Sequence, residues 1–168
     1  MRSCGKCYVC CDVPRIDSGT LNKPAYTICE RIDCSLENGY CSIYKERSLN
    51  CAGFECTWKQ GYGKEDDRPD LSGLFAFIRD FNGGEYIFAI ELVPHAVFES
   101  GKNIILDMVK KIDNLAVIVS NYGVKPPYDN GDRVIVKSSL LYRSRNIRGI
   151  FLNNLAPDVG VYVLKDSK

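Results

Sequence analysis

The sequence predicts an α+β fold in which a small, irregular cysteine-cluster module packs beside a mostly antiparallel sheet with one main helix. Three observations support this. All nine cysteines lie between Cys4 and Cys56, and the 112 residues after Cys56 contain none. The chain before Gly63 has no sustained helical or strand period, whereas the chain after Leu71 has both. Hydrophobic residues make up 45% of the chain and charged residues 26%, a balance typical of a folded protein with a core.

We expect three parts along the chain: a cysteine-cluster module over residues 1–63, a connector over 64–70 and an α+β domain over 71–168. In the first part Gly, Pro, Asn, Asp and Cys interrupt the sequence every few residues. A segment below about 70 residues with this composition needs staples, and the thiols are the candidates. The connector carries Asp66, Asp67 and Asp70 without the spacing of an oxygen-ligand site, so we expect a hydrophilic surface loop.

In the α+β domain, periodicity and turn residues predict each element. Two strands, 71–80 and 85–92, flank the hairpin signal Asn82-Gly83-Gly84. Ser100 is the expected N-cap of a helix through Ile112, with one apolar stripe made of Ile104, Ile105, Met108, Val109 and Ile112. Further strands are expected over 115–119, 133–142, 147–152 and 159–164, with a turn at Asp129-Asn130-Gly131.

Charge and hydropathy exclude some classes of partner. The chain has 22 Lys and Arg against 21 Asp and Glu, a formal charge of +1, which argues against bulk electrostatic binding of nucleic acid or anionic lipid. No window approaches 18 consecutive apolar residues, and the first residues lack a secretory apolar stretch, so we expect a cytoplasmic protein without a membrane span. In a reducing cytosol clustered thiols are more often metal ligands or redox catalysts than disulfides. A secreted domain linked by disulfides, its signal removed, is the alternative.

The cysteine spacing is typical of metal sites. It reads Cys4-x2-Cys7-x2-Cys10-Cys11, then after seventeen residues Cys29-x4-Cys34-x6-Cys41-x9-Cys51-x4-Cys56. Two residues between thiols form a knuckle that directs both sulfurs to one ion. Adjacent cysteines point in different directions, which predicts two metal centres or one multinuclear centre. Four thiolates complete a tetrahedral zinc site, so eight cysteines fill two sites and one is left over; alternatively, four hold an iron–sulfur cluster.

Thiolate metal sites carry negative charge that attracts hydrogen-bond donors. Two divalent ions bound by eight thiolates would change the formal charge from +1 to −3, so binding should release protons. Candidate donors to the sulfurs are the backbone N–H groups of Gly5, Lys6, Gly39 and Gly53 and the side chain of Arg47. A surface ion pair with a neighbouring Glu explains Arg47 equally well.

These residues resemble the YkgJ-like cysteine-cluster proteins, a family described as zinc- or iron-chelating. Its signature is C-x-x-C-x-x-C-C, a middle pair of cysteines, then C-x-I-Y-x-x-R-P-x-x-C-x-x-F. The second half is matched here by Cys41-Ser42-Ile43-Tyr44-Lys45-Glu46-Arg47 and Cys51-Ala52-Gly53-Phe54. The resemblance runs from Cys4 to Trp58, about a third of the chain, and the run from Arg68 to Gly73 resembles the segment that follows the cluster in some members. Ser48 replaces the family's Pro, and Cys56 occurs in only some members, which makes Cys56 the least secure ligand.

The resemblance implies a metal-chelating protein with zinc or iron in a mainly structural role. The candidate ligands are all nine cysteines, namely Cys4, Cys7, Cys10, Cys11, Cys29, Cys34, Cys41, Cys51 and Cys56. Two zinc ions are expected, with an iron–sulfur cluster as the alternative. Related clusters in flagellin lysine N-methylases imply a second function, an iron–sulfur-dependent enzyme or redox partner acting on a protein or peptide, although no S-adenosylmethionine-binding Gly-rich turn is visible. A redox module working by Cys-x-x-Cys exchange is a third hypothesis.

Two other features have structural explanations. His95 is the only histidine, and we expect a structural role for it because it is far from the cysteines in sequence. Arg143, Arg145 and Arg148 form a basic cluster that we interpret as a solvated loop in a chain of nearly neutral charge. The sequence therefore assigns no catalytic residue.

Overall fold

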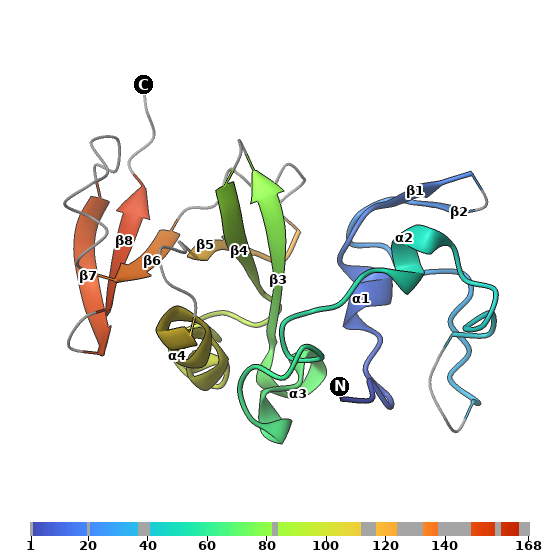
Figure 1. Cartoon of the computed structure of the whole chain (residues 1–168), viewed down its shortest axis with the longest axis horizontal. Helices are drawn as coiled ribbons and strands as arrows, with labels where there is room; N and C mark the ends of the chain where they lie inside the picture. The colour runs from blue at the N-terminus through green and yellow to red at the C-terminus, as the bar shows by residue number, and fades with distance from the viewer. Residues whose placement is uncertain are drawn as a thin grey trace.

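A computed structural model describes residues 2–19, 21–36, 41–81, 84–111, 117–123, 133–137, 149–156 and 159–164. The cysteine-rich segment contains only short elements: α1 (Val9–Asp12), β1 (Ile16–Ser18), β2 (Leu21–Lys23) and α2 (Leu49–Ala52). It is followed by η1 (Glu65–Asp67), α3 (Pro69–Ser72), β3 (Leu74–Phe81), β4 (Gly84–Glu91), α4 (Lys102–Lys111), β5 (Val117–Asn121), β6 (Arg133–Lys137), β7 (Gly149–Ala156) and β8 (Val159–Leu164). Figure 1 shows the first four elements on one side of β3. The α+β class is confirmed.

Six strands form one mixed sheet in the order β3-β4-β5-β6-β8-β7. The pairing of β4 with β5 is parallel, and the other four pairings are antiparallel. The parallel pair has a simple origin, because α4 lies between β4 and β5 in the chain and parallel neighbours need such a crossover. The described sheet is therefore mostly antiparallel.

The chain around residue 70 differs from the predicted loop and strand. Residues 65–72 form the turns η1 and α3, and β3 begins only at Leu74. Asp67 is buried, and its carboxylate accepts a hydrogen bond from the Lys64 backbone N–H at 2.6 Å, so the surface-loop prediction is wrong at Asp67, whereas Asp66 and Asp70 are exposed as expected. Pro69 favours a helical start, and Gly73 ends α3 in the left-handed region at φ 69°.

The main helix begins later than predicted. It starts at Lys102, and the Ser100 hydroxyl donates to the Ser72 carbonyl instead of capping it. Ile104, Ile105 and Met108 of the expected stripe are fully buried. The turn residues 82–83 and 129–131, the strand ends 115–116, 138–142 and 147–148, and Ile112 lie outside the described residues.

The two faces of the sheet have different partners. Successive strand residues face opposite sides, and the register aligns Phe75 with Ile90 and Phe77 with Phe88. Phe54 of the cysteine-rich segment packs on this aromatic face, with ring centroids 5.9 Å from Phe75 and 5.8 Å from Phe77. On the opposite face Leu74 lies against the start of α4, where a Cβ at Gly101 would come within 2.5 Å of it. The aromatic face of the sheet thus carries Phe54, whereas the end of the cysteine-rich segment reaches α4 directly, where the Gly63 backbone N–H donates to the Asp107 carboxylate at 2.9 Å.

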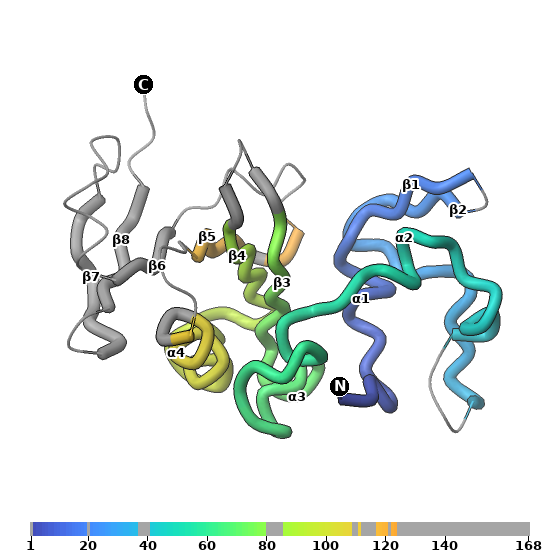
Figure 2. The backbone as a smooth tube through the Cα atoms, viewed as in Figure 1, coloured from blue at the N-terminus to red at the C-terminus, as the bar shows by residue number. Residues whose placement is uncertain are grey.

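The cysteine-rich segment also covers the edge of the sheet. β3 is an edge strand of the sheet, and the Thr57 backbone N–H donates to the Ala76 carbonyl at 2.9 Å. Trp58 beside it is 2% exposed and belongs to the same hydrophobic cluster as the sheet residues. Figure 2 shows the segment, blue to cyan, wound beside β3.

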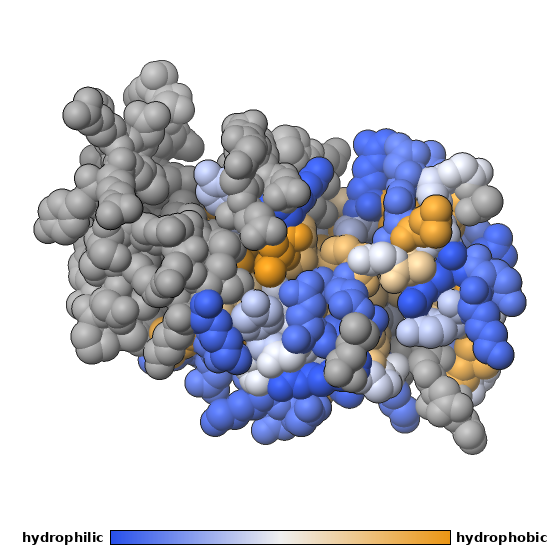
Figure 3. Space-filling view, viewed as in Figure 1, coloured by the Kyte–Doolittle hydropathy of each residue, from blue (hydrophilic) through white to orange (hydrophobic). Residues whose placement is uncertain are grey.

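Away from these contacts the segment has little apolar interior. Among the described residues between Ile16 and Cys56, only Lys23 and Cys29 are buried. Large apolar side chains remain exposed there, namely Ile28, Leu36, Tyr44 and Leu49. In the view of Figure 3 the described surface is mostly hydrophilic, with small apolar patches. In the described part of the chain, no helix has the length and apolar character needed to cross a membrane.

We expect Gly73→Ala to destabilise the protein. Gly73 is left-handed at φ 69°, which costs an L-residue about 1 to 2 kcal/mol, and a Cβ there would come within 2.4 Å of Val93 Cγ2. The free energy of unfolding, measured with urea, should fall by more than about 1 kcal/mol. Gly19→Ala is the control, since nothing lies within 4 Å of a Cβ there. Equal stability of the two variants would contradict the packing described at Gly73.

Candidate metal centre

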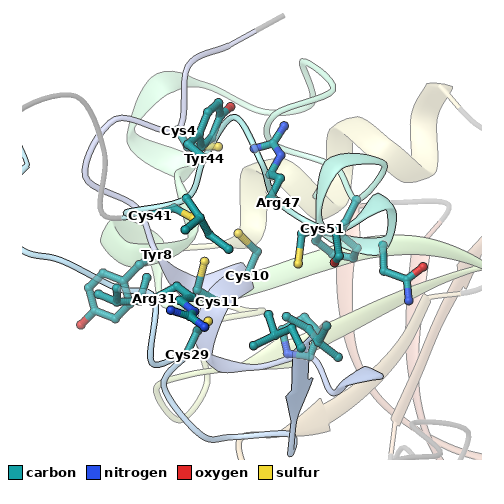
Figure 4. Close-up of a pocket in the computed structure, with 18 of the residues that line it drawn as sticks. Cys4, Tyr8, Cys10, Cys11, Cys29, Arg31, Cys41, Tyr44, Arg47 and Cys51 are labelled. Carbon is teal, nitrogen blue, oxygen red and sulfur yellow. The ribbon is translucent and has the colours of Figure 1, made fainter. Parts of the chain in front are cut away.

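One cavity of about 420 Å³ collects most of the thiols in the molecule. Eight of the nine cysteines line it: Cys4, Cys7, Cys10, Cys11, Cys29, Cys41, Cys51 and Cys56. All nine cysteines are free thiols. Figure 4 shows the labelled cysteines among these directed toward a common space, with Tyr8, Tyr44, Arg31 and Arg47 around it.

Helix α1 places two adjacent thiols in this cavity. Val9 and Val13, four residues apart, are both buried in the cluster of the sheet, which fixes the helix and its C-cap against the core. Cys10 and Cys11 lie between them in sequence and reach the cavity. Because successive helical residues point about 100° apart, the two sulfurs start in different directions. Adjacent cysteines in a short helix can therefore serve two sides of one cavity.

Three cysteines reach the cavity from a loop, an isolated β-bridge and a short helix. The Cys29 backbone N–H donates to the Cys11 carbonyl at 3.0 Å, so Cys29 lies against the end of α1. Cys41 forms a bridge with Ile32, and Ser42 next to it donates to the Arg31 carbonyl at 2.8 Å. Cys51 belongs to α2, which contacts β1.

The N-terminal residues lie against residues 58–63. Arg2 donates to the carbonyls of Trp58 at 3.0 Å, Tyr62 at 2.7 Å and Gly63 at 2.8 Å. Its backbone N–H donates to the Lys59 carbonyl at 3.4 Å. The first residues are thereby held beside the turn that follows Cys56, which brings Cys4 to the same end of the cavity.

The ninth cysteine lies elsewhere. Cys34 is exposed and does not line the cavity, whereas Cys56 is buried and does. The sequence had singled out Cys56 as the least secure ligand; in the structure Cys34 is the cysteine set apart. His95 is exposed and outside the cavity as well. Gly39 and the cluster Arg143, Arg145 and Arg148 lie outside the described residues.

Cations surround the thiols. Arg47 makes no ion pair within the described part of the chain; its guanidinium lies over the Tyr44 ring at 3.9 Å and acts electrostatically on Cys4 and Cys11. This favours the donor role for Arg47 over the surface ion pair. Lys59 is near Cys4 but also pairs with Glu55 at 3.1 Å.

Lys23 is a buried cation near the cavity thiols that the sequence gave no reason to select. It is 3% exposed, and its ammonium donates to the carbonyls of Asp12 at 2.6 Å, Pro24 at 2.8 Å and Thr27 at 2.8 Å. Burial lowers its pKa, and the nearby Asp12, Cys29, Cys11 and Cys51 oppose that shift. A single Lys in a three-residue strand has no distinguishing pattern, so only the fold reveals this position.

The segment from Arg68 to Gly73 meets the cluster at Cys7. Burial raises the pKa of Cys7 to about 12, and the Asp70 carboxylate adds to the rise. Asp70 accepts two hydrogen bonds from Arg68, at 2.6 and 3.0 Å. The two runs that carry the family resemblance are therefore neighbours in space.

The adjacent thiols differ in acidity. A hydrogen bond from Cys10, followed by the charges of Lys23 and Arg47, lowers the pKa of Cys11 to about 7 against burial, which acts the other way. The same hydrogen bond and burial raise the pKa of Cys10 well above 9.0. Above about pH 7 the pair therefore holds one proton, on Cys10, and Cys11 is the more nucleophilic of the two thiols.

Within the described residues, no three Cys, His, Asp or Glu side chains are close enough as they stand to hold a metal ion. The cavity nevertheless supplies a soft sulfur donor set of the kind that zinc and iron–sulfur clusters use. The donors fit such a metal in type and number, and binding would have to draw the sulfurs together.

Comparisons of this chain with protein-family models, with curated proteins and with solved structures find no match. The resemblance to the cysteine-cluster family therefore rests on the motif residues alone.

Alkylation of metal-free protein should distinguish the thiols. Since the thiolate is the nucleophile, the rate at Cys11 should rise with pH and be half-maximal near pH 7, while Cys7 should react slowly until about pH 12. Peptide mapping by mass spectrometry after iodoacetamide treatment measures both rates. Cys10→Ala removes the hydrogen bond and should move the midpoint of Cys11 up toward 9.0. A midpoint near 9 in the unmodified sequence would contradict the hydrogen bond.

Replacing Lys23 with Met should loosen the cysteine-rich segment. Three backbone carbonyls lose a charged donor, and hydrogen bonds to charged groups contribute about 1.5 to 3 kcal/mol each. We expect a loss of at least about 1.5 kcal/mol in the free energy of unfolding. Lys45→Met, at an exposed position, should change it by less than about 0.5 kcal/mol. Matching values for the two variants would rule out a role for the buried ammonium.

Proposed function

We propose that this chain is a metal-chelating protein whose cysteine-lined cavity binds zinc, with two ions as the expected content. The observation that supports the proposal is the gathering of eight free thiols around one cavity, from segments as far apart in sequence as Cys4 and Cys56. Thiolates are the ligands of structural zinc, and four complete each ion. The resemblance to the YkgJ-like family supports the same function independently, through spacing.

The role we propose for the metal is mainly structural. Between Ile16 and Cys56 the described chain buries only Lys23 and Cys29, so apolar burial contributes little to holding this stretch together. Structural zinc contributes roughly 10 to 16 kcal/mol of binding free energy in small domains. Four-thiolate sites also leave no coordination position for a substrate or water, so a zinc ion held there would stabilise the fold and would not act as a Lewis acid.

The charges around the cavity suit an anionic metal site. Two zinc ions bring four positive charges and eight thiolates bring eight negative ones, which leaves four negative charges. Lys23, Arg47, Lys59 and Arg68 all act electrostatically on these thiols. Of these, Lys59 and Arg68 are partly neutralised by Glu55 and Asp70. The stacked Arg47 and the buried Lys23 are the stronger candidates for stabilising the bound state.

The alternative metal is iron in an iron–sulfur cluster, which would suit an enzyme or redox partner acting on a protein or peptide. The same thiols would serve as ligands, and the nearby Lys and Arg side chains would stabilise an anionic cluster in the same way. We place the protein in the cytoplasm, where thiols stay reduced and available to metal.

Elemental analysis of protein purified without oxygen, with a visible absorption spectrum, tests the function. About two zinc ions per chain and a colourless solution are expected. If iron and sulfide are found and the solution is brown, the bound group is an iron–sulfur cluster and not zinc. Absence of any bound metal, with nine titratable thiols, would refute the proposal.

Removing the metal should open the middle of the cysteine-rich segment and leave the sheet intact. We expect chelator to make residues 17–55 sensitive to protease, because few of their described side chains are buried. The ends of the segment should stay protected, since Val9, Val13 and Trp58 belong to the sheet's hydrophobic cluster. Limited proteolysis with mass mapping and circular dichroism follow both parts, and Cys34→Ser should behave like the unmodified chain. Unchanged protection of 17–55 after metal loss would contradict the structural role.

A further inference from the structure

We propose that the eight cavity cysteines form two four-thiolate sites, each of which binds one zinc ion. The first site consists of Cys4, Cys7, Cys10 and Cys56, and the second consists of Cys11, Cys29, Cys41 and Cys51. Cys34 belongs to neither. This inference rests on the proposed function and adds the grouping of ligands, which spacing alone leaves open.

The first site is built on the N-terminal turn. Cys4 and Cys7 are joined by a tight turn in which the Cys7 backbone N–H donates to the Cys4 carbonyl at 2.9 Å. Cys7 lies two residues before α1 and Cys10 lies within it, and both pack against the sheet's hydrophobic cluster. Cys56 belongs to that cluster, and the contact of Arg2 with Lys59 brings Cys4 beside it.

The second site is built around the end of α1. Cys29 is tied to Cys11 by its backbone hydrogen bond at 3.0 Å. Cys41 is held next to this pair by its bridge to Ile32, three residues after Cys29. Cys51 completes the group from α2 and lines the same cavity, where Figure 4 shows it among the other labelled cysteines. The buried ammonium of Lys23 donates at 2.6 Å to the carbonyl of Asp12, the residue after Cys11, and so lies at this end of α1.

The two groups adjoin at Cys10 and Cys11, which follow each other in α1 and both line the cavity. The sites are therefore neighbours, with α1 between them.

Zinc content of purified variants tests the grouping. We expect two ions in the unmodified chain and in Cys34→Ser, and one ion in Cys56→Ser and in Cys51→Ser. The double variant within a site, Cys7→Ser with Cys56→Ser, should still hold one ion. The double variant across sites, Cys51→Ser with Cys56→Ser, should hold none. Cobalt(II) bound in place of zinc gives a second readout, because each intact four-thiolate site contributes its own sulfur-to-metal absorption.

A protection experiment on the unmodified chain avoids variants that fail to fold. Metal-free protein is loaded with less than one equivalent of zinc and alkylated, and peptides are mapped by mass spectrometry. Thiols should become protected in two sets of four, with Cys34 reactive throughout. Protection of all eight together, or loss of both ions in every single variant, would overturn the division in favour of one multinuclear centre. Two ions with ligand sets that include Cys34 would overturn the grouping alone, whereas a chain that binds no zinc would overturn the proposed function as well.

Discussion

The arrangement of the cysteine-rich segment depends on how α1 is held against the sheet. Val9 and Val13 are buried in the core, and the two residues that follow Val9 are both cysteines that face the cavity. This one helical turn therefore packs on the hydrophobic core through its valines and lines the cavity with its cysteines. The backbone bonds of Cys7 to Cys4 and of Cys29 to Cys11 extend from its two ends, so the rest of the cavity is assembled around it.

Beyond α1 the segment uses polar groups where an ordinary domain would use hydrocarbon. Lys23 occupies a buried position and joins three carbonyls from residues 12, 24 and 27, and Arg2 joins three more from residues 58, 62 and 63. Both are cations surrounded by backbone oxygens, which gives the segment order without apolar volume. Such a scaffold positions side chains but buries little surface, which is why we assign much of its stability to a bound metal.

Sequence reasoning predicted the class, the order of strands along the chain and the apolar residues of α4, because periodicity and turn residues report local burial. It missed the turns around Asp67 and Pro69, where a buried carboxylate replaced the expected loop. It selected the cavity cysteines by their spacing, yet it could not separate Cys34 from Cys56, since that depends on contacts between residues distant in sequence. For the same reason Lys23 was not selected, and Asp70 was assigned to a surface loop and not to the surroundings of Cys7.

The hydrogen bond from the Thr57 backbone N–H to the Ala76 carbonyl places the residue after Cys56 against the edge of the sheet. β3 is the outer strand of the sheet, and an uncovered outer strand presents backbone donors and acceptors to any other extended chain. The stretch that carries Cys56 occupies part of that edge, so anything that releases it would also bare a template for self-association. Because the neighbouring Trp58 belongs to the sheet's hydrophobic cluster, this cover depends on apolar packing and should persist when the cavity is empty.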